Sequence, residues 1–350
     1  MRIALDGTPL TVPSGGVPRY TEELARALAV AFPDDSFQLV SDQPFEHPLR
    51  MPADDSSLFA GRWWSWRLPR LLKRNRIDLF HGTEFAVPYL PVIPSVLSLH
   101  DLSPWLNEAW HSGADRVRRR TPWLIRLHAA TMVITMTEAV RRQAIAHFRI
   151  EPARVAVTPL AAADHFRPVL DAPAATPYFV YVGTIEPRKN VPMLVEAWRE
   201  IRRTHPGVRL VIAGRRRADG PDIESEPGLD VFGLTPDSEL PALYSGAVAA
   251  LYPSFYEGFG LPVLEAMQCG AAVIASKDPA VMEVSGGAAM HCDARSPGEW
   301  IAAMTALLES ESLCADYQAR SLTRAAEFSW ERTARLTREV YDEAQRRFRA

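Results

Sequence analysis

Short apolar runs alternate along the chain with longer segments in which apolar residues recur at helical spacing. The runs in the first half cover residues 2–6, 37–41, 78–82, 95–99, 132–136 and 154–158, and those in the second half cover 178–183, 208–214, 229–233, 247–254, 271–276 and 288–292. Most are almost continuously apolar, which is typical of strands buried on both faces of a parallel sheet. Helical segments between successive strands indicate right-handed βαβ units. The pattern therefore predicts an α/β protein.

A segment rich in proline and alanine divides this pattern into two halves, and 350 residues suit two domains. We predict an N-terminal Rossmann-like domain over 1–167, a linker over 168–177 and a second Rossmann-like domain over 178–328. An amphipathic helix over 329–350 is expected to pack back on the N-terminal domain. Two doubly wound sheets that face each other across a cleft would carry their ligand-binding loops after the strands.

Composition and charge exclude several classes of protein. The formal net charge is −3, so no general attraction to nucleic acid is expected. The three cysteines have no metal-ligand spacing, which is typical of a reducing compartment. No apolar run approaches the roughly 18 residues that span a bilayer. We expect a soluble, cytoplasmic protein without a metal or a nucleic-acid partner.

The stretch YEGFGLPVLEAMQCG, residues 256–270, places two glutamates around a glycine loop that opens a predicted helix. Gly258 and Gly260 let the backbone approach a ligand, and the free amides of the helix start attract an anion. Glu257 and Glu265 supply carboxylates that bind hydroxyl groups. A ligand that carries both phosphate and hydroxyls is a nucleotide sugar. The alternative is a glutamate that ends a strand and another that is solvated on a helix.

Two cations follow the first strand of the second half, in YVGTIEPRKN. Arg188 and Lys189 can neutralise a diphosphate leaving group without a metal ion. An ordinary basic loop before a helix is the alternative.

Candidate residues of the first half also follow predicted strands. Gly15 and Gly16 precede a helix, with Arg19 nearby, although most glycine pairs are only turns. His100 and Asp101 stand at a strand end, where a ligand contact and a satisfied core histidine are the two alternatives.

His81 and Glu84 follow another predicted strand of the first half. We predict that they face an acceptor, together with Arg19 and Asp101.

The stretch PSFYEGFGLPVLEAMQCGAAVIAS resembles the signature of glycosyltransferase family 4, the group 1 glycosyltransferases, which are retaining enzymes of GT-B fold. The likeness covers nearly the whole chain and is strongest over 178–285. It implies that Glu265 holds the ribose hydroxyls and that Glu257 lies near the donor sugar and its phosphates. The catalytic residues it implies are His100, Glu257, Arg188 and Lys189, and the donor-binding residues are Gly15, Gly16, Gly183, Thr184, Phe232, Gly233, Leu234, Gly258, Phe259, Gly260, Leu261 and Glu265.

The resemblance implies a retaining, metal-independent hexosyltransferase that uses a nucleotide sugar and no further cofactor. The wording HDLSP, residues 100–104, is similar to that of members that use GDP-mannose in polysaccharide biosynthesis. Thr184 departs from the family, which often carries arginine at this place, so Arg188 is expected to supply the second positive charge. The alternatives are a UDP-sugar-dependent transferase and a non-catalytic nucleotide-sugar-binding subunit.

Segments 62–76 and 116–126 combine basic residues with tryptophan. This composition suits an anionic membrane surface, and a solvated basic helix with inward tryptophans is the alternative. We expect a glycan or lipid-linked glycan acceptor at the inner face of the cytoplasmic membrane.

Overall fold

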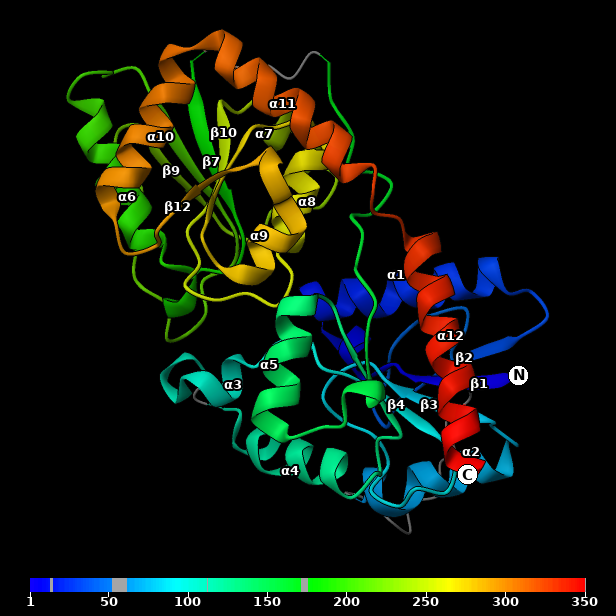
Figure 1. The fold of residues 1–350 in the computed structure, drawn as a ribbon. Coiled ribbons are helices and arrows are strands. Elements are labelled where there is room, and N and C mark those ends of the chain that lie inside the picture. The colour runs from blue at the N-terminus through cyan, green and yellow to red at the C-terminus, as the bar shows by residue number, and fades with distance from the viewer. Residues whose placement is uncertain (13–14, 52–61, 112, 171–175, 350) are drawn as a thin grey trace. The chain divides into compact units, whose positions relative to one another are not determined.

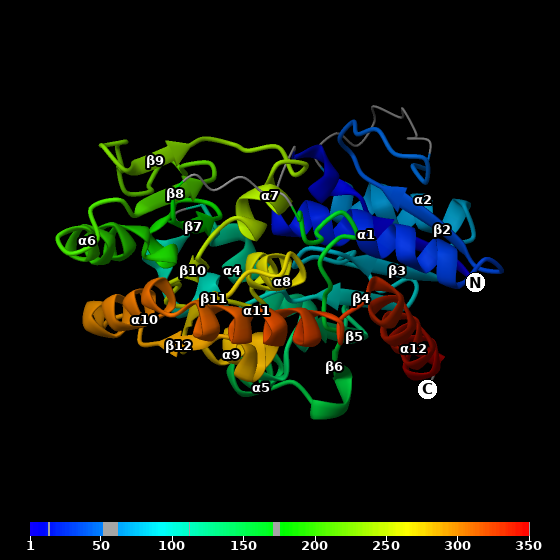
Figure 2. The same ribbon diagram turned by 90° about the horizontal axis from the view of Figure 1, so that it is seen from above.

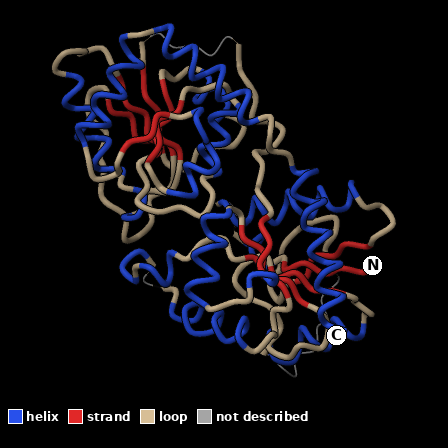
Figure 3. Tube along the Cα trace, viewed as in Figure 1, coloured by secondary structure: helices blue, strands red, loops and turns tan. Residues whose placement is uncertain are grey.

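The computed structural model describes residues 1–12, 15–51, 62–111, 113–170 and 176–349 (Figure 1). The chain forms two compact units: Met1–Leu160 with Ser329–Ala350, and Ala161–Phe328. In each unit a parallel six-stranded sheet lies between helices (Figure 3). The α/β class predicted from the apolar runs is confirmed, since each run coincides with a strand.

The first unit has the strand order β2-β1-β3-β4-β5-β6. Its strands are β1 (Arg2–Asp6), β2 (Ser36–Val40), β3 (Leu79–Gly82), β4 (Ser95–Ser98), β5 (Met132–Thr135) and β6 (Val155–Val157). Its α-helices are α1 (Gly16–Ala31), α2 (Leu68–Arg74), α3 (Ser103–Leu106), α4 (Asp115–Arg126), α5 (Glu138–Phe148) and α12 (Trp330–Arg349). Short 3-10 helices are η1 (Thr8–Thr11), η4 (Glu108–Trp110) and η5 (Pro152–Arg154), and η3 (Trp63–Arg67) is a π-helical turn. The order reverses beside β1, and such a switch point is where open sheets bind ligands.

Helix α12 belongs to the first unit and packs against α1. Its buried positions Ala334, Thr337 and Tyr341 recur at helical spacing, so one buried stripe of the helix faces the rest of the unit. The Tyr341 hydroxyl lies 2.7 Å from His81 Nδ1 on β3. Helix α12 thus supplies a hydrogen-bond partner for the buried His81 side chain of β3.

The second unit has the strand order β12-β11-β10-β7-β8-β9. Its strands are β7 (Tyr178–Val182), β8 (Arg209–Ala213), β9 (Leu229–Phe232), β10 (Ala249–Tyr252), β11 (Val273–Ser276) and β12 (Met290–Cys292). Its helices are α6 (Val191–Arg202), α7 (Leu240–Ser245), α8 (Leu261–Gln268), α9 (Pro279–Ser285), α10 (Pro297–Glu309) and α11 (Glu311–Ala325), with turns η6 (Pro187–Lys189) and η7 (Gly286–Ala288).

Helices α6 and α10 of the second unit pack together, and α8 packs against α9 and α11 (Figure 2). Trp198 of α6 and Trp300 of α10 are fully buried in the same apolar cluster as Phe179 of β7. This buried cluster packs around β7 and β10, whose carboxyl ends carry the predicted donor-binding loops. No described helix in either unit is long and apolar enough to cross a membrane.

Candidate active site

The carboxyl end of β7 is shaped by a close approach of two loops. Gly214, with φ of 154°, follows β8, and a Cβ atom there would lie 2.0 Å from the Gly183 carbonyl oxygen. Only glycine permits this backbone packing, because the φ value is positive and a side chain has no room. Thr184 follows Gly183 directly, and its carbonyl accepts a hydrogen bond of 3.0 Å from the Tyr181 hydroxyl.

Turn η6 brings both predicted cations to the buried carboxylate of Glu257. Lys189 Nζ lies 2.6 Å from Glu257 Oε1, and Arg188 Nη1 lies 3.1 Å from Glu257 Oε2. Lys189 also donates to the Tyr252 hydroxyl at 3.0 Å, at the end of β10. The structure therefore unites Arg188, Lys189 and Glu257, which the sequence placed in two separate motifs.

A second carboxylate extends this cluster. Glu186 Oε1 accepts a hydrogen bond of 2.8 Å from Arg188 Nη2, and Glu186 Oε2 accepts one of 2.5 Å from Arg217 Nη1. Arg217 follows β8 and also pairs with Asp219. Sequence reasoning missed Glu186 and Arg217: Glu186 stands two residues before Arg188, but nothing in the sequence showed which of three consecutive arginines would reach it.

The charges of this cluster act on one another strongly because they are buried. Burial alone would raise the pKa of Glu257, but the positive charges of Lys189 and Arg188 outweigh it and lower that pKa to about 2. Burial also lowers the pKa of Lys189, and Arg188 adds to this shift while Glu257 opposes it. Glu257 is therefore a carboxylate at neutral pH, held between two cations.

Helix α8 begins directly after the loop that contains Glu257 and Gly258. Gly260 caps it with φ of 91°, a left-handed conformation that favours glycine. The Phe259 ring packs against Phe328 with 6.0 Å between ring centroids, so the backbone of this residue, and not its ring, is left for a ligand. Gly258 and Leu261 are also buried, and Glu265 is only 1% exposed on the first turns of the helix.

The predicted base-binding residues lie in the loop after β9. Phe232 is 47% exposed and Leu234 is 63% exposed, and Gly233 lies between them. The Gly214 amide contacts the carbonyls of Phe232 and Gly233 at 3.3 and 3.1 Å. The loop after β9 and the two loops that contain Gly183 and Gly214 thus lie at the same edge of the second sheet.

The first unit holds the remaining candidates. Gly15, with φ of 139°, precedes α1, and the Arg19 amide donates to its carbonyl at 3.2 Å. Gly16 is the first residue of that helix, and Arg19 is half-buried. His100 is also half-buried, and its Nε2 lies 2.7 Å from the Thr83 carbonyl oxygen, which requires a proton on Nε2. Burial lowers the pKa of His100, so the ring is neutral and Nδ1 can accept a hydrogen bond.

The side chains of two acceptor-side candidates, His81 and Asp101, already make hydrogen bonds within the first unit. His81 is fully buried, with Nδ1 at 2.7 Å from Tyr341 and Nε2 at 2.8 Å from Ser98, so it has the geometry of a core histidine. Asp101 Oδ1 accepts from the amide and the hydroxyl of Ser103 and organises the start of α3. Glu84, in contrast, is exposed.

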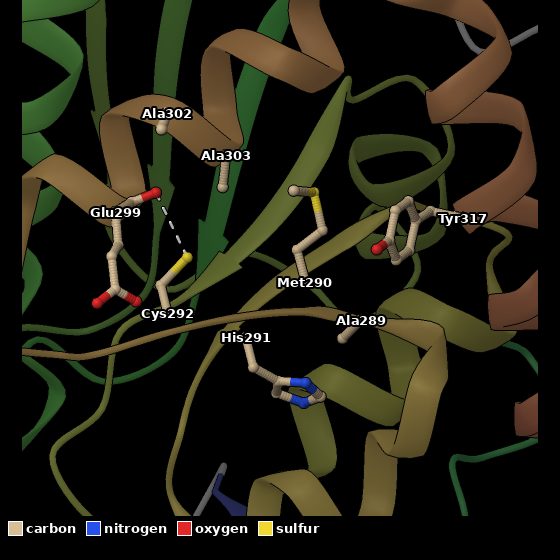
Figure 4. A pocket seen from close by; sticks show the side chains of 8 residues that line it. All are labelled: Ala289, Met290, His291, Cys292, Glu299, Ala302, Ala303 and Tyr317. Atoms are coloured by element: carbon tan, nitrogen blue, oxygen red, sulfur yellow. Dashed lines mark hydrogen bonds between the residues drawn. The ribbon is translucent and has the colours of Figure 1, made fainter.

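A cavity of about 420 Å³ lies beside the edge strand of the second sheet (Figure 4). Met290 and Cys292 of β12 lie on one side of the strand and His291 on the other. Ala289, just before β12, and residues of α10 and α11 complete the lining. The Cys292 thiol donates to the Glu299 carbonyl at 3.5 Å, and burial raises the pKa of this thiol to about 11. This cavity contains none of the residues predicted for the donor.

Comparison with known proteins identifies the family. The sequence profile of the group 1 glycosyl transferases matches residues 163–324, and that of glycosyltransferase family 4 matches residues 14–162. The O-antigen chain mannosyltransferase B of Escherichia coli is 30% identical, over 97% of this chain and 99% of the relative. The chain belongs to the group 1 glycosyltransferases.

Solved structures agree with this assignment at the level of the fold. The sucrose-phosphate synthase of Thermosynechococcus elongatus matches with a TM-score of 0.73 and 20% identity, over 98% of each chain. HepE of Anabaena, solved with UDP and glucose, matches with a TM-score of 0.73 and 17% identity, over 98% of this chain and 100% of HepE. The GT-B fold and the hexosyltransferase class predicted from the sequence are confirmed for this glycosyltransferase.

Proposed function

We propose that this glycosyltransferase transfers mannose from GDP-mannose, with retention of configuration and without a metal ion, to a glycan or lipid-linked glycan of a surface polysaccharide. The observation that carries the proposal is the buried cluster of Lys189, Arg188 and Glu257 at the strand ends of the second unit. The name of the Escherichia coli relative, an O-antigen chain mannosyltransferase, supports mannose and a polysaccharide product.

The cluster suits the departure of a nucleoside diphosphate. When the bond between the anomeric carbon and the phosphate oxygen breaks, negative charge develops on the diphosphate. Two cations in a water-poor site stabilise that charge more than they would in water, because the local dielectric constant is low. Lys189 and Arg188 would therefore do the work that a bound metal does in other transferases.

Glu257 keeps the two cations in place. Each carboxylate oxygen pairs with a different cation, so the side chains of Lys189 and Arg188 are positioned before the donor arrives. The amides at the start of α8, next to Gly260, add a positive dipole end from the same edge of the sheet. Glu265 and the loop of Phe232 and Leu234 are the proposed contacts of the ribose and the base.

Retention would follow from attack by the acceptor hydroxyl on the face that the diphosphate leaves. His100, a neutral ring with an acceptor nitrogen at Nδ1, is the proposed first-unit contact of the donor sugar. Gly15 and Gly16 at the start of α1 are proposed contacts of the phosphates.

We also propose that the first unit rests on an anionic membrane surface. Trp66 of η3 is 55% exposed, and Trp123 and Leu127 at the end of α4 are 58% and 67% exposed. The two segments adjoin, since the Arg120 guanidinium lies 5.5 Å above the Trp64 ring. Exposed basic residues of the same segments are Arg62, Arg70, Lys73, Arg74, Arg76, Arg116, Arg119 and Arg126. Indole rings flanked by cations suit the headgroup region of a bilayer.

The experiment that tests the function combines binding and turnover. Thermal unfolding is measured with GDP-mannose, GDP, UDP-glucose, UDP and ADP-glucose, each with and without chelator, because a ligand of the native state raises the midpoint. Stabilisation by the guanosine compounds alone, unaffected by chelator, is expected, with release of GDP when a glycan acceptor is added. An anomeric NMR signal of an α-mannoside supports retention. Stabilisation by UDP compounds only would overturn the choice of donor.

A further inference from the structure

Two arginines of α4 meet at one tyrosine hydroxyl of the first unit. Arg116 Nη2 lies 3.5 Å from the Tyr89 hydroxyl. The Arg120 guanidinium lies 5.5 Å from the centre of the Trp64 ring, and the Tyr89 amide donates to the Trp64 carbonyl at 2.9 Å. The two arginines stand four residues apart, so their side chains leave the same face of the helix. The two arginines, the tyrosine and the tryptophan thus form one cluster.

This cluster holds two positive charges that carboxylates do not neutralise. Arg118 of the same helix pairs with Asp115. Neither Arg116 nor Arg120 forms an ion pair with a carboxylate among the residues that the structure describes. Burial would raise the pKa of Tyr89, but hydrogen bonds from both arginines, together with their charges, lower it. Positive charge is therefore in surplus around the tyrosine oxygen, and an anion would be stabilised there.

Both guanidinium groups keep donors for such an anion. Arg116 is exposed and Arg120 is half-buried. A guanidinium has five N–H donors, and the single tyrosine hydroxyl engages only part of them. Asp6 and Glu84 act on the charge of Arg120 at longer range, without a described ion pair. Paired guanidiniums with free donors suit phosphate oxygens, which accept two parallel hydrogen bonds from each.

Exposed apolar side chains adjoin the two cations. Leu90 directly follows Tyr89 and is 46% exposed. Val92 is 44% exposed, and its amide donates to the Leu90 carbonyl at 2.9 Å, which holds both in one turn. Trp66, two residues after Trp64, is 55% exposed. A free phosphate ion gains nothing from these neighbours, whereas a hydrocarbon chain attached to the phosphate is removed from water against them.

We propose that Arg116, Arg120 and Tyr89 bind a doubly charged phosphate group that is carried on a lipid chain. The guanidiniums donate to the phosphate oxygens, and Leu90 and Val92 contact the chain. Two guanidiniums match the charge of about −2 of a phosphomonoester or of a diphosphate that links two groups. The phosphodiester of an ordinary phospholipid carries a single charge and matches less well. The inference rests on the proposed function, because it describes how the lipid-linked acceptor is recognised.

The test is calorimetric titration of dihexanoyl phosphatidic acid into the whole chain at pH 8, below the micelle concentration of this lipid and with saturating GDP. GDP occupies the diphosphate site proposed for the second unit, so phosphate binding there does not add to the signal. The wild type is expected to bind saturably. Dihexanoyl phosphatidylglycerol, which has one charge, and inorganic phosphate, which has no chain, should each bind roughly tenfold more weakly.

Single substitutions locate the binding site. Arg116→Gln should weaken the binding of dihexanoyl phosphatidic acid roughly tenfold, the usual loss with one charge-assisted hydrogen bond. Arg116→Lys keeps the charge but loses the paired donors, so its affinity should lie between the two. Arg120→Gln should weaken binding as Arg116→Gln does. The matched control is Arg142→Gln, at an exposed position of α5, which removes the same charge and should bind as the wild type does.

The outcomes separate this site from the proposed reaction. Equal affinity of the wild type and Arg116→Gln, or no binding of phosphatidic acid, would overturn the site. Equal affinity for inorganic phosphate would overturn the lipid, and equal affinity for phosphatidylglycerol would overturn the doubly charged group. If GDP does not raise the unfolding midpoint, the proposed reaction fails instead, and the comparison of Arg116→Gln with Arg142→Gln still decides on the lipid site.

Discussion

Lys189 Nζ lies 2.6 Å from Glu257 Oε1, although 68 residues separate the two along the chain. The pair joins the turn after β7 to the loop before α8, and both side chains are buried. A buried ion pair of this kind rarely adds net stability, because desolvation of both charges opposes their attraction. Its contribution here is to fix the positions of two cations, Lys189 and Arg188, at a strand end.

Replacing Lys189 by alanine should remove half of the charge that stabilises the leaving diphosphate. We expect turnover at saturating donor to fall roughly 10²- to 10³-fold, the usual effect of losing one preorganised donor. The variant should also be less stable by about 3–5 kcal/mol, because a buried Glu257 is left without its closest cation. Steady-state kinetics and urea unfolding measure the two effects.

The double variant Lys189→Met/Glu257→Gln separates those effects. Removing both charges should restore most of the lost stability, because no buried carboxylate is left beside an apolar side chain. Turnover should stay low. Recovery of turnover together with stability would show that Lys189 supports the fold and not the reaction.

Glu265→Gln should weaken donor binding more than it slows turnover. Hydrogen bonds from hydroxyls to a buried carboxylate contribute about 1.5–3 kcal/mol each, so the donor KM should rise roughly tenfold or more. The exposed Glu239→Gln variant is the control and should keep the wild-type KM. An unchanged donor KM in Glu265→Gln would remove Glu265 from the donor site.

The lowered pKa of Glu257 predicts that the free energy of unfolding falls in acid. Its pKa is lowered from 4.5 to about 2 in the folded state. A lowered pKa contributes stability that is present above pH 4.5 and lost as the pH falls toward 2, on the order of 3 kcal/mol. Urea unfolding at pH 6, 4 and 3 should show the difference between wild type and Glu257→Gln shrinking with acid. A constant difference would contradict the buried ion pair.

Membrane contact is tested with vesicles that contain phosphatidylglycerol. Wild-type protein should co-sediment with them, and added salt should weaken the interaction. The exposed residues Arg70, Lys73, Arg116 and Arg119, changed together to glutamine, should abolish it, at about 1 kcal/mol per charge. The matched control changes the exposed residues Arg142, Arg203, Arg335 and Arg346 and should still bind. No binding by the wild type would contradict the proposal.

The sequence predicts most of the fold, because each of the twelve strands lies within a short, mostly apolar run that can be recognised from the sequence alone. It also predicts that Arg188, Lys189 and Glu257 lie at strand ends. It does not predict that they pair with one another, since the contact depends on how two loops of one sheet edge meet. The role of Glu186 as the bridge from Arg188 to Arg217 depends on the same packing.

Other contacts are beyond local patterns altogether. The partner of His81 is Tyr341, 260 residues away, so the strand-end position alone could not distinguish a core histidine from a ligand contact.

The most direct test of the metal-free diphosphate site is calorimetric titration of GDP into the protein in the presence of EDTA. The proposal predicts saturable binding of GDP by the wild type, and binding at least tenfold weaker by the folded Lys189→Met/Glu257→Gln variant. UDP should bind the wild type more weakly than GDP. Binding of GDP that requires added Mg²⁺, or equal affinity in the double variant, would contradict the account.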